Sequence, residues 1–416
     1  MIRNYNFIIK QKITELLEYI LLILIIIEFN TPYPQLFESV QFAVRNLGIF
    51  ILLCVVILRG KVKLDVMSCC LLLGSIIPLI GVSSDRIIEL IKIFAVYIPL
   101  FYVFFASHNS RTIILFFLKY SNIVLIVAIV SLFFWLFGSI LGIITPTMKV
   151  PYEWGGLKII PTYYGLYFET QEAYATVESD LTIRNSGIFN EAPMYNMILC
   201  TALGIELFLR KKLSYWRIII FVATIVTTIS TTGFLFLLLV MTYKLYIAMS
   251  GKLRILIVVF IPFLLIIASF TAQMILENKI MTNTSSFYAR SSDIQKCIEI
   301  GMDNPLIGIG MDADNNTSKN RTAMWGYSNS LFTVFARGGI YVLSLYVFAL
   351  FYVPLSLYKR NPNLAMLIFG FAIVFSFTIS YLRLLTLMMI GFGMSLYVVN
   401  RKKVYKDKEF NEHYVI

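Results

Sequence analysis

The chain has 416 residues, of which 59% are apolar and only 14% are charged, whereas a soluble domain is about half apolar and about a quarter charged. This composition excludes an ordinary soluble domain, and the net charge of +12 does not require a nucleic-acid partner, because a membrane protein collects Lys and Arg in its cytoplasmic loops. Five cysteines give no disulfide framework, and two histidines exclude a histidine-rich metal site. We expect neither a metal nor a cofactor.

Apolar runs of about 18 residues or more recur along the whole chain, and each is long enough to cross roughly 30 Å of hydrocarbon as a helix. They predict an all-α, polytopic transmembrane bundle that forms a single membrane domain over residues 1–416. The first run is followed by "NTPYPQ" without a small-residue cleavage site, so we expect it to be a retained helix. About twelve spans are predicted, at residues 14–31, 42–59, 64–82, 87–106, 121–144, 192–209, 215–230, 232–249, 255–273, 328–353, 364–381 and 384–400.

Positive charge alternates along the connections between these runs. Arg59 ends the second run, "RKK" (210–212) follows the sixth, and "RKKVYKDK" (401–408) follows the last. By the positive-inside rule this side is cytoplasmic, so both termini are expected inside. The alternation requires a tight outer turn at "STTG" (230–233), since a continuous helix there would place the later basic loops outside.

Two long loops, 145–191 and 274–327, lie on the outer side in this topology. Loops of this length are uncommon unless they have a function. Both contain aromatic residues and Pro/Gly turns, as in "VPYEWGG", "PTYYGLYF" and "AMWGYSN". We therefore expect both loops to be folded caps that contain short helices.

The first loop ends in "RNSGIFNEAPMYN". Arg184 and Glu191 flank a turn at Gly187, and Pro193 suits the first turn of the helix that follows. One interpretation is a helix entry, in which an acid stabilises the helix N-terminus. The other gives the two charged residues a role in binding or catalysis.

The second loop contains "SSFYARSSDIQKCIEIGMD". Ser292 and Gln295 form a capping-box pattern, and Gly301 is a typical helix end. These residues predict a short helix on the outer surface that starts near Ser292. Arg290 would then lie at or just before the helix N-terminus, where a guanidinium and the helix dipole together favour an anion.

Two more arginines fall within predicted spans, Arg337 in "FARGGI" and Arg383 in "SYLRLL". An arginine at mid-membrane costs about 2.5–3.5 kcal/mol and rarely faces lipid. One interpretation is that each arginine pairs with an acid inside the membrane. The other is that Arg184, Arg290, Arg337 and Arg383 line one outward-facing cavity for a multiply charged anion, since guanidinium groups match phosphate oxygens bidentately.

The motifs of both loops occur in a definite order. "RNSGIFNEAP" precedes the spacing Arg290-x10-Gly301, which is followed by "NPLIGIG", whose "GIG" we interpret as a turn, and by "SNSLFTVFARGGI". With these motifs around its last large outer loop, the chain resembles the Wzy-type polymerases of O-antigen and capsular polysaccharide, which are relatives of the O-antigen ligases. The resemblance covers the topology and, in motif, residues 184–340.

The resemblance implies a GT-C-like, metal-independent glycosyltransferase in the bacterial inner membrane. Such an enzyme joins repeat units carried on undecaprenyl pyrophosphate, transferring the growing glycan from lipid pyrophosphate to a sugar hydroxyl of the incoming unit. Arg184, Arg290, Arg337 and Arg383 are then candidates to bind the pyrophosphate and stabilise its charge. Glu191 is the candidate base for the acceptor hydroxyl.

The same resemblance suggests sugar-binding residues and partners. Trp154, Tyr163, Trp325 and Tyr327 are candidate platforms for sugar rings, and each also suits a membrane-interface anchor. The expected partners are the lipid-linked oligosaccharide, membrane lipid, a chain-length regulator protein and a flippase. No nucleic acid is expected.

Two alternatives stay open, an O-antigen ligase-like transferase and a flippase for lipid-linked oligosaccharides. In the ligases a His-Asn pair begins the helix that here follows Ser328 and Asn329, and neither His108 nor His413 lies in an outer loop. This disfavours a histidine-assisted ligase. A flippase would also need a cationic cavity, but short loops and two homologous halves would be expected, and the sequence has neither.

Overall fold

The computed structural model describes residues 2–33, 40–59, 65, 67–68, 71, 92–153, 157–174, 181–249, 285–310 and 329–404. Within these residues the chain is mostly helical, as predicted. Three helical stretches are long and apolar enough to cross a membrane by length and composition, and shorter apolar helices accompany them. The three are Ser110–Ile140, Thr231–Ala248 and Ser330–Leu357. Predicted span 255–273 and most of 64–82 lie outside the described residues.

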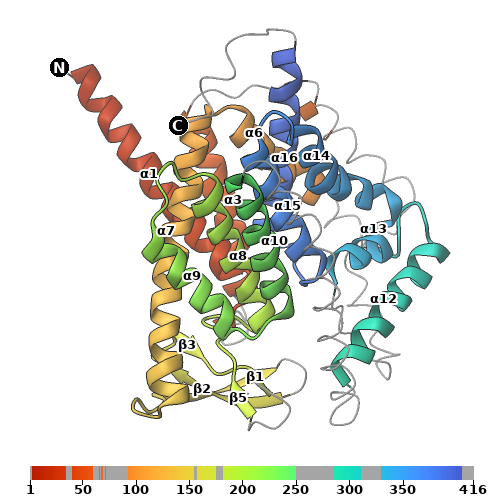
Figure 1. The fold of residues 1–416 in the computed structure, drawn as a ribbon. Helices are drawn as coiled ribbons and strands as arrows, with labels where there is room; N and C mark the ends of the chain where they lie inside the picture. The colour runs from red at the N-terminus through yellow and green to blue at the C-terminus, as the bar shows by residue number, and fades with distance from the viewer. Residues whose placement is uncertain are drawn as a thin grey trace.

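The helices pack side by side in a bundle around α8 (Ala192–Phe208), whose residues are almost all buried (Figure 1). On one side of the bundle α1 (Ile2–Glu28) packs against α3 (Val40–Arg59) and α7 (Ser110–Phe134). α7 and α9 (Tyr215–Thr227) in turn pack against α8. Apolar side chains on every face of α8 explain its central position, because such a helix has no polar stripe to expose.

The later part of the chain completes the bundle. α10 (Thr231–Ala248) and α15 (Pro362–Ser376) pack against α8, and α6 (Ile98–Ala106) packs against α16 (Leu384–Val404). Three π-helical segments and one short helix extend these elements: η2 (Lys92–Tyr97), η3 (Trp135–Ile140), η5 (Phe348–Tyr352) and α14 (Val353–Leu357).

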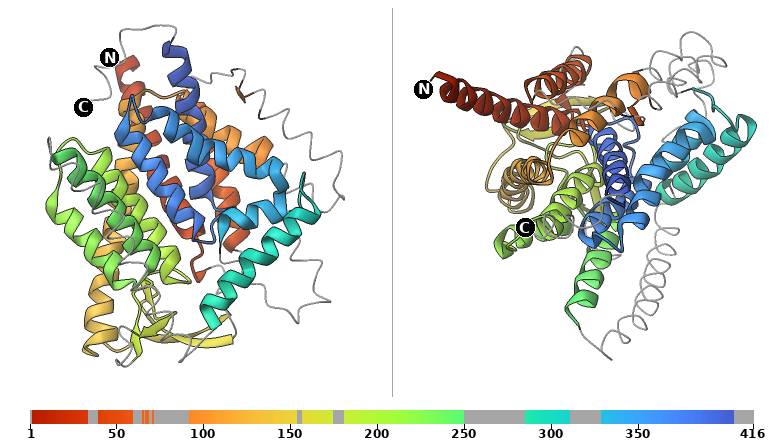
Figure 2. Two further views of the ribbon diagram at one scale, coloured as in Figure 1. Left: turned by 45° about the vertical axis from the view of Figure 1, so that its right-hand side comes forward. Right: turned by 90° about the horizontal axis from the view of Figure 1, so that it is seen from above.

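The two ends of the bundle differ. The start of α1 and the end of α16 lie at one end, and the strands lie at the other (Figures 1 and 2). A turn does separate α9 from α10, but it lies at 228–230 with Ile229 at a φ of 48°, and not at the predicted 230–233, because Thr231 to Gly233 already belong to α10.

The described part of the first long loop forms strands, so the expectation of short helices there was wrong. β1 (Met148–Glu153), β2 (Leu157–Tyr163) and β3 (Tyr167–Phe168) form an antiparallel sheet in that order. β4 (Glu172–Tyr174) pairs with β5 (Leu181–Ile183) in a second, two-stranded sheet.

The physical reason for these strands is the alternation of side chains along them. Val150, Tyr152 and Ile160 pack with Phe168 in a small core, whereas Pro151, between buried Val150 and Tyr152, is exposed. A period of two along the chain favours a half-buried strand over a helix. The signal was present in "MKVPYE" and "LKIIPTY".

α12 (Ser285–Asp303) lies along α13 (Ser330–Val347) at the periphery of the bundle (Figure 2). The predicted helix start near Ser292 was wrong, because the helix already begins at Ser285, and Arg290 is inside it rather than at its N-terminus. Gly301 does not end the helix either. A Cβ at Gly301 would lie 2.4 Å from the ring of Phe335, so this glycine allows α12 and α13 to approach closely.

Candidate functional site

Three segments meet at the strand-bearing end of the bundle. They are residues 28–31 at the end of α1, 185–191 before α8, and 377–383 between α15 and α16, and we call them together the loop junction. Asn30 joins all three segments. Its side-chain amide donates to the backbone carbonyl of Ile379 at 3.2 Å, and its backbone carbonyl accepts from the backbone amide of Asn190 at 2.8 Å. The junction therefore connects segments from opposite ends of the sequence.

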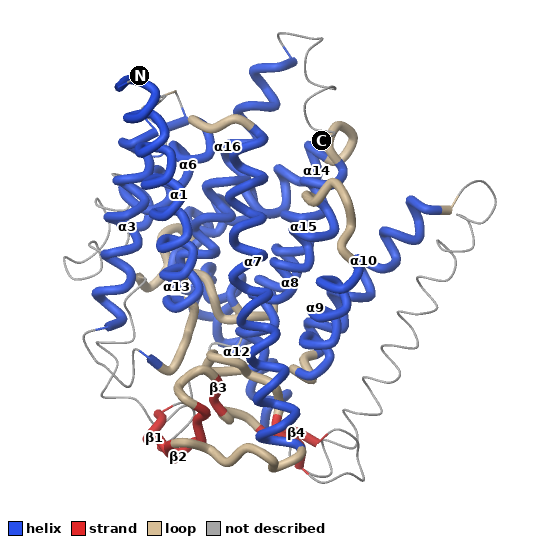
Figure 3. Tube along the Cα trace, turned by 90° about the vertical axis from the view of Figure 1, so that its left-hand side faces the viewer, coloured by secondary structure: helices blue, strands red, loops and turns tan. Residues whose placement is uncertain are grey.

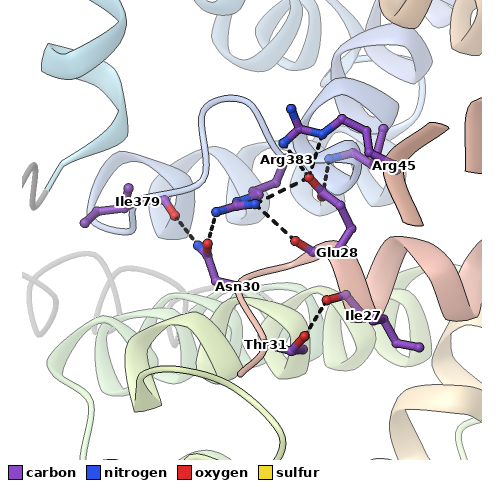
Figure 4. A network of polar contacts seen from close by, with 8 residues as sticks. Ile27, Glu28, Asn30, Thr31, Arg45, Ile379 and Arg383 are labelled. Carbon is purple, nitrogen blue, oxygen red and sulfur yellow. Dashed lines mark hydrogen bonds and ion pairs between the residues drawn. The ribbon is translucent and has the colours of Figure 1, made fainter. Parts of the chain in front are cut away.

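Glu28 is the charged centre of the loop junction (Figure 4). Its buried carboxylate accepts hydrogen bonds from Arg45 at 2.7 and 3.1 Å, from the amide of Leu384 at 3.0 Å, and forms an ion pair with Arg383 at 3.5 Å. Arg383 also donates to the carbonyl oxygen of Glu28 at 3.2 Å and to the side chain of Asn30. In the contacts that the structure describes here, two guanidinium groups face one carboxylate, so these three groups together carry one positive charge in excess.

Arg337 lies next to the same junction. Its side chain is buried, and its guanidinium carbon lies 5.4 Å from the centre of the Tyr381 ring, a cation–π distance. Tyr381 belongs to the 377–383 segment, and its carbonyl accepts from the hydroxyl of Tyr346 at 2.6 Å. Arg337 of α13 thus contacts the same segment that ends in Arg383.

α13 is broken two residues after Arg337, where Gly339 has a φ of 62°. The break leaves backbone groups unpaired within the helix, and the turn at 305–310 pairs with them. Ile309 and Gly310 donate to the carbonyls of Ala336 and Arg337 at 3.0 and 2.9 Å, and Ile340 donates to the carbonyl of Pro305 at 2.8 Å. These contacts satisfy the backbone where the helix opens, as a buried segment requires.

The turn predicted at "GIG" is confirmed by the same contacts. Gly308 and Gly310 have φ values of 70° and 100°, in the region that favours glycine. A Cβ at Gly308 would lie 2.4 Å from the backbone of Arg337. The motifs "NPLIGIG" and "ARGGI" therefore form one docked unit in space.

Glu191 is the N-cap residue of α8, and its backbone carbonyl accepts from the amides of Met194 and Tyr195, both at 3.1 Å. Its half-buried side chain makes no capping hydrogen bond. Glu191 therefore begins the helix, as one interpretation predicted, but only its backbone contributes hydrogen bonds there. Tyr152 lies close by, because its hydroxyl donates to the carbonyl of Asn190 at 2.9 Å. Burial, and secondly the charge of Glu191, raise the pKa of Tyr152.

Arg184 donates hydrogen bonds to backbone carbonyls in the turn between α9 and α10. Its Nε donates to the carbonyl of Thr228 at 2.8 Å and its NH2 to that of Ile229 at 3.2 Å, directly after the end of α9. A cation at these carbonyls also complements the helix dipole. Arg184 thus holds the turn between α9 and α10, and this contact does not direct it to the same point as Arg337 and Arg383.

The structure describes one of the four residues predicted to stack on sugar rings, Tyr163. Tyr163 is buried, its ring packs over Gly138, and its hydroxyl donates to Glu169 at 2.8 Å, so it offers no open face to a sugar. Its neighbour Tyr164 is the exposed residue of the pair, at 70%. The other three platforms, Trp154, Trp325 and Tyr327, lie outside the described residues, and the structure does not describe the side chain of Arg290.

Of the predicted residues, Glu191 and Arg383 belong to segments of the loop junction, and Arg337 contacts Tyr381 of the same junction. The sequence interpretation missed three residues: Glu28 and Asn30 of the junction, and Arg45, which pairs with Glu28. An acid that ends the apolar run "LLILIIIE" was a usable signal, since ionisable residues within apolar runs are rare and are usually paired. Among the described residues, no group of three His, Cys, Asp or Glu side chains is arranged to hold a metal ion.

Comparison with known proteins gives no relative for this chain: no family model, curated protein or solved structure matches it.

Proposed function

We propose that this protein is a membrane glycosyltransferase that polymerises oligosaccharide repeat units carried on undecaprenyl pyrophosphate. In this proposal it crosses the bacterial inner membrane about twelve times, with both termini in the cytoplasm. The loop junction and the strands then lie at the outer face. The order of the sequence motifs and the composition of the junction support the proposal.

The observation that carries it is the excess positive charge of the Glu28 cluster at the strand-bearing end. A pyrophosphate leaving group develops negative charge as its bond to the sugar breaks, and fixed guanidinium groups lower the energy of that state. Arg45 and Arg383 together exceed the charge of Glu28 by one. Arg337 brings a third guanidinium to Tyr381 of the same junction.

The proposed reaction is the transfer of the growing glycan to a hydroxyl of the incoming unit, and it requires a base. A hydroxyl oxygen of the incoming unit attacks the anomeric carbon of the growing glycan, and the bond between that carbon and the pyrophosphate oxygen breaks. The leaving lipid pyrophosphate takes the electron pair, and the hydroxyl proton passes to a base. Glu191 is the proposed base, since it adjoins the junction and its carboxylate is not used to cap α8.

The test is the length of the surface glycan in a host that lacks the gene and is complemented with variants. Arg383→Lys keeps a positive charge beside Glu28 but loses the planar fork. We expect it to yield mainly single repeat units, with a rate reduced about 100-fold or more, the effect of removing one charge-stabilising donor. Arg217→Lys is the matched control, because Arg217 pairs with buried Glu206 away from the junction.

Protein levels in the membrane are measured for every variant. If Arg383→Lys makes polymer of wild-type length, the junction does not bind the pyrophosphate. If the deletion strain exports no single units at all, the block precedes polymerisation, and a flippase replaces the polymerase as the function.

A further inference from the structure

A cleft of about 550 Å³ is lined by residues of α1, α3 and α7. The start of α1, which contributes to the lining, lies at the end of the bundle opposite the strands (Figures 1 and 3). The volume of the cleft lies within the range of about 300–1,000 Å³ that small-molecule sites occupy. Three cations line it, Lys10, Arg59 and Lys119, and two acids, Glu15 and Glu18. None of these residues belongs to the loop junction.

Glu18 is already paired, so its charge is not available to a ligand. Its carboxylate is buried, with one oxygen bonded to Arg59 and the other to Lys119 at 2.7 Å. Glu15 lies on the exposed side and accepts a hydrogen bond from Gln11 at 3.0 Å. Three positive and two negative charges leave the lining with one positive charge in excess.

Donors for an anion remain in the cleft after these pairings. The buried Nε of Arg59 has no hydrogen-bond partner among the residues that the structure describes. Lys10 is exposed and makes no ion pair within the same residues. An arginine Nε–H and a mobile ammonium are both suited to phosphate oxygens.

The surroundings of the cleft are apolar and face outward. Leu16, Ile57 and Leu115 are 61%, 62% and 50% exposed on α1, α3 and α7. Exposed aliphatic side chains on membrane-type helices suit contact with acyl chains. A ligand that satisfies the charges and the flanks together has a charged head and apolar tails.

We propose that this cleft binds the phosphodiester headgroup of an anionic phospholipid such as phosphatidylglycerol. One excess positive charge matches a headgroup with one negative charge, and basic pockets between transmembrane helices bind such headgroups. A pyrophosphate carries more charge and would be repelled by Glu15. The site is independent of the proposed polymerase activity.

The test is native mass spectrometry of the purified full-length protein with phosphatidylglycerol or phosphatidylcholine. We expect phosphatidylglycerol to be retained preferentially. Lys10→Gln should lower its affinity about fivefold, the contribution of one cation near a membrane surface, and Glu15→Gln should raise it by a similar factor. Arg59→Lys, which keeps the pair with Glu18 but loses Nε, should also weaken binding. Lys212→Gln, another exposed cation, is the control and should change nothing.

Two results would overturn the proposal. One is equal retention of the two lipids with no difference between Lys10→Gln and Lys212→Gln. The other is displacement of phosphatidylglycerol by millimolar inorganic phosphate, which would make the cleft a site for a free anion. Opposite effects of Lys10→Gln and Glu15→Gln cannot arise from general loss of folding, so the test stays decisive if Arg59→Lys is unstable.

Discussion

Two buried glutamates, Glu28 and Glu206, are each paired with two arginines, but their partners come from different distances along the chain. Glu206 accepts from Arg210, one helical turn later, at 2.5 Å and from Arg217 at 2.8 Å. Glu28 pairs with Arg45, 17 residues away, and with Arg383, 355 residues away. The Glu206 cluster holds neighbouring helices together, whereas the Glu28 cluster joins the first helix to the last.

The difference indicates where in the bundle a charged cluster can form part of a ligand-binding site. The partners of Glu206 lie on α9 and just after the end of α8, and Ser121 of α7 donates a further hydrogen bond at 2.5 Å, so helices surround this carboxylate. The Glu28 cluster instead lies where α1 ends and α16 begins, next to the non-helical segments 29–31 and 377–383. A site for a charged ligand is more readily built there.

The largest effect is expected for Glu28→Ala. It leaves two largely buried guanidinium groups without their carboxylate, and breaking a buried pair costs about 3–5 kcal/mol. The free energy of unfolding in detergent, measured by denaturant titration, checks this. A loss below about 1 kcal/mol would mean that the cluster contributes no more than an exposed ion pair.

Glu206→Ala should destabilise less, by about 2–3 kcal/mol, although the carboxylate it removes is as deeply buried. Arg210 can turn toward solvent, and Arg217 keeps its hydrogen bond to Asn122 at 2.7 Å. The same titration gives the comparison directly. An equal or larger loss than for Glu28→Ala would contradict the distinction between the two clusters.

Arg184→Ala tests a predicted site residue that the structure uses otherwise. It removes two hydrogen bonds to carbonyls at the end of α9, and we expect a loss of about 2 kcal/mol, since bonds from charged donors are worth about 1.5–3 kcal/mol. Arg184→Lys should recover part of it. Wild-type stability combined with lost polymer would instead assign Arg184 to the substrate.

The smallest effect is a pH dependence at the opposite end, in the connection between α6 and α7. Burial lowers the pKa of His108 to about 4, with a smaller contribution from the charge of Arg59, although the hydrogen bond between His108 and the carbonyl of Phe104 acts in the opposite direction. Because the folded pKa lies below the unfolded value of about 6.5, stability is fully present above pH 6.5 and is lost as the pH falls toward 4. We expect a loss on the order of 1–2 kcal/mol. His108→Gln should remove this dependence; an unchanged pH profile would contradict it.

Local patterns in the sequence predict much of the fold. Hydropathy gives the helical membrane character, and the charge alternation predicts a turn between α9 and α10, although the turn lies at 228–230 and not at 230–233. The α12 boundaries could not be predicted from the capping pattern at Ser292, because "SSFYAR" before it is also compatible with helix and the packing of Gly301 against Phe335 extends the helix beyond that glycine.

The candidate site was predicted only in part, for three physical reasons. The pairing of Arg383 with Glu28 spans almost the whole chain, and no local spacing signals it. The acceptors of Arg184 are backbone carbonyls, which have no sequence signature. For Tyr163 and Tyr164 the cause is the end of the strand, since buried Tyr163 is the last residue of β2 and exposed Tyr164, with a φ of 53°, begins the turn that follows.

The most direct test of the proposed polymerase is reconstitution of the purified protein in vesicles with lipid-linked repeat units from a host that lacks the gene. Polymer length and released undecaprenyl pyrophosphate are measured together. We predict one released lipid pyrophosphate for each repeat unit added, and neither product with Arg383→Lys. Movement of intact lipid-linked units across the bilayer without any release of pyrophosphate would contradict the polymerase and identify a transporter.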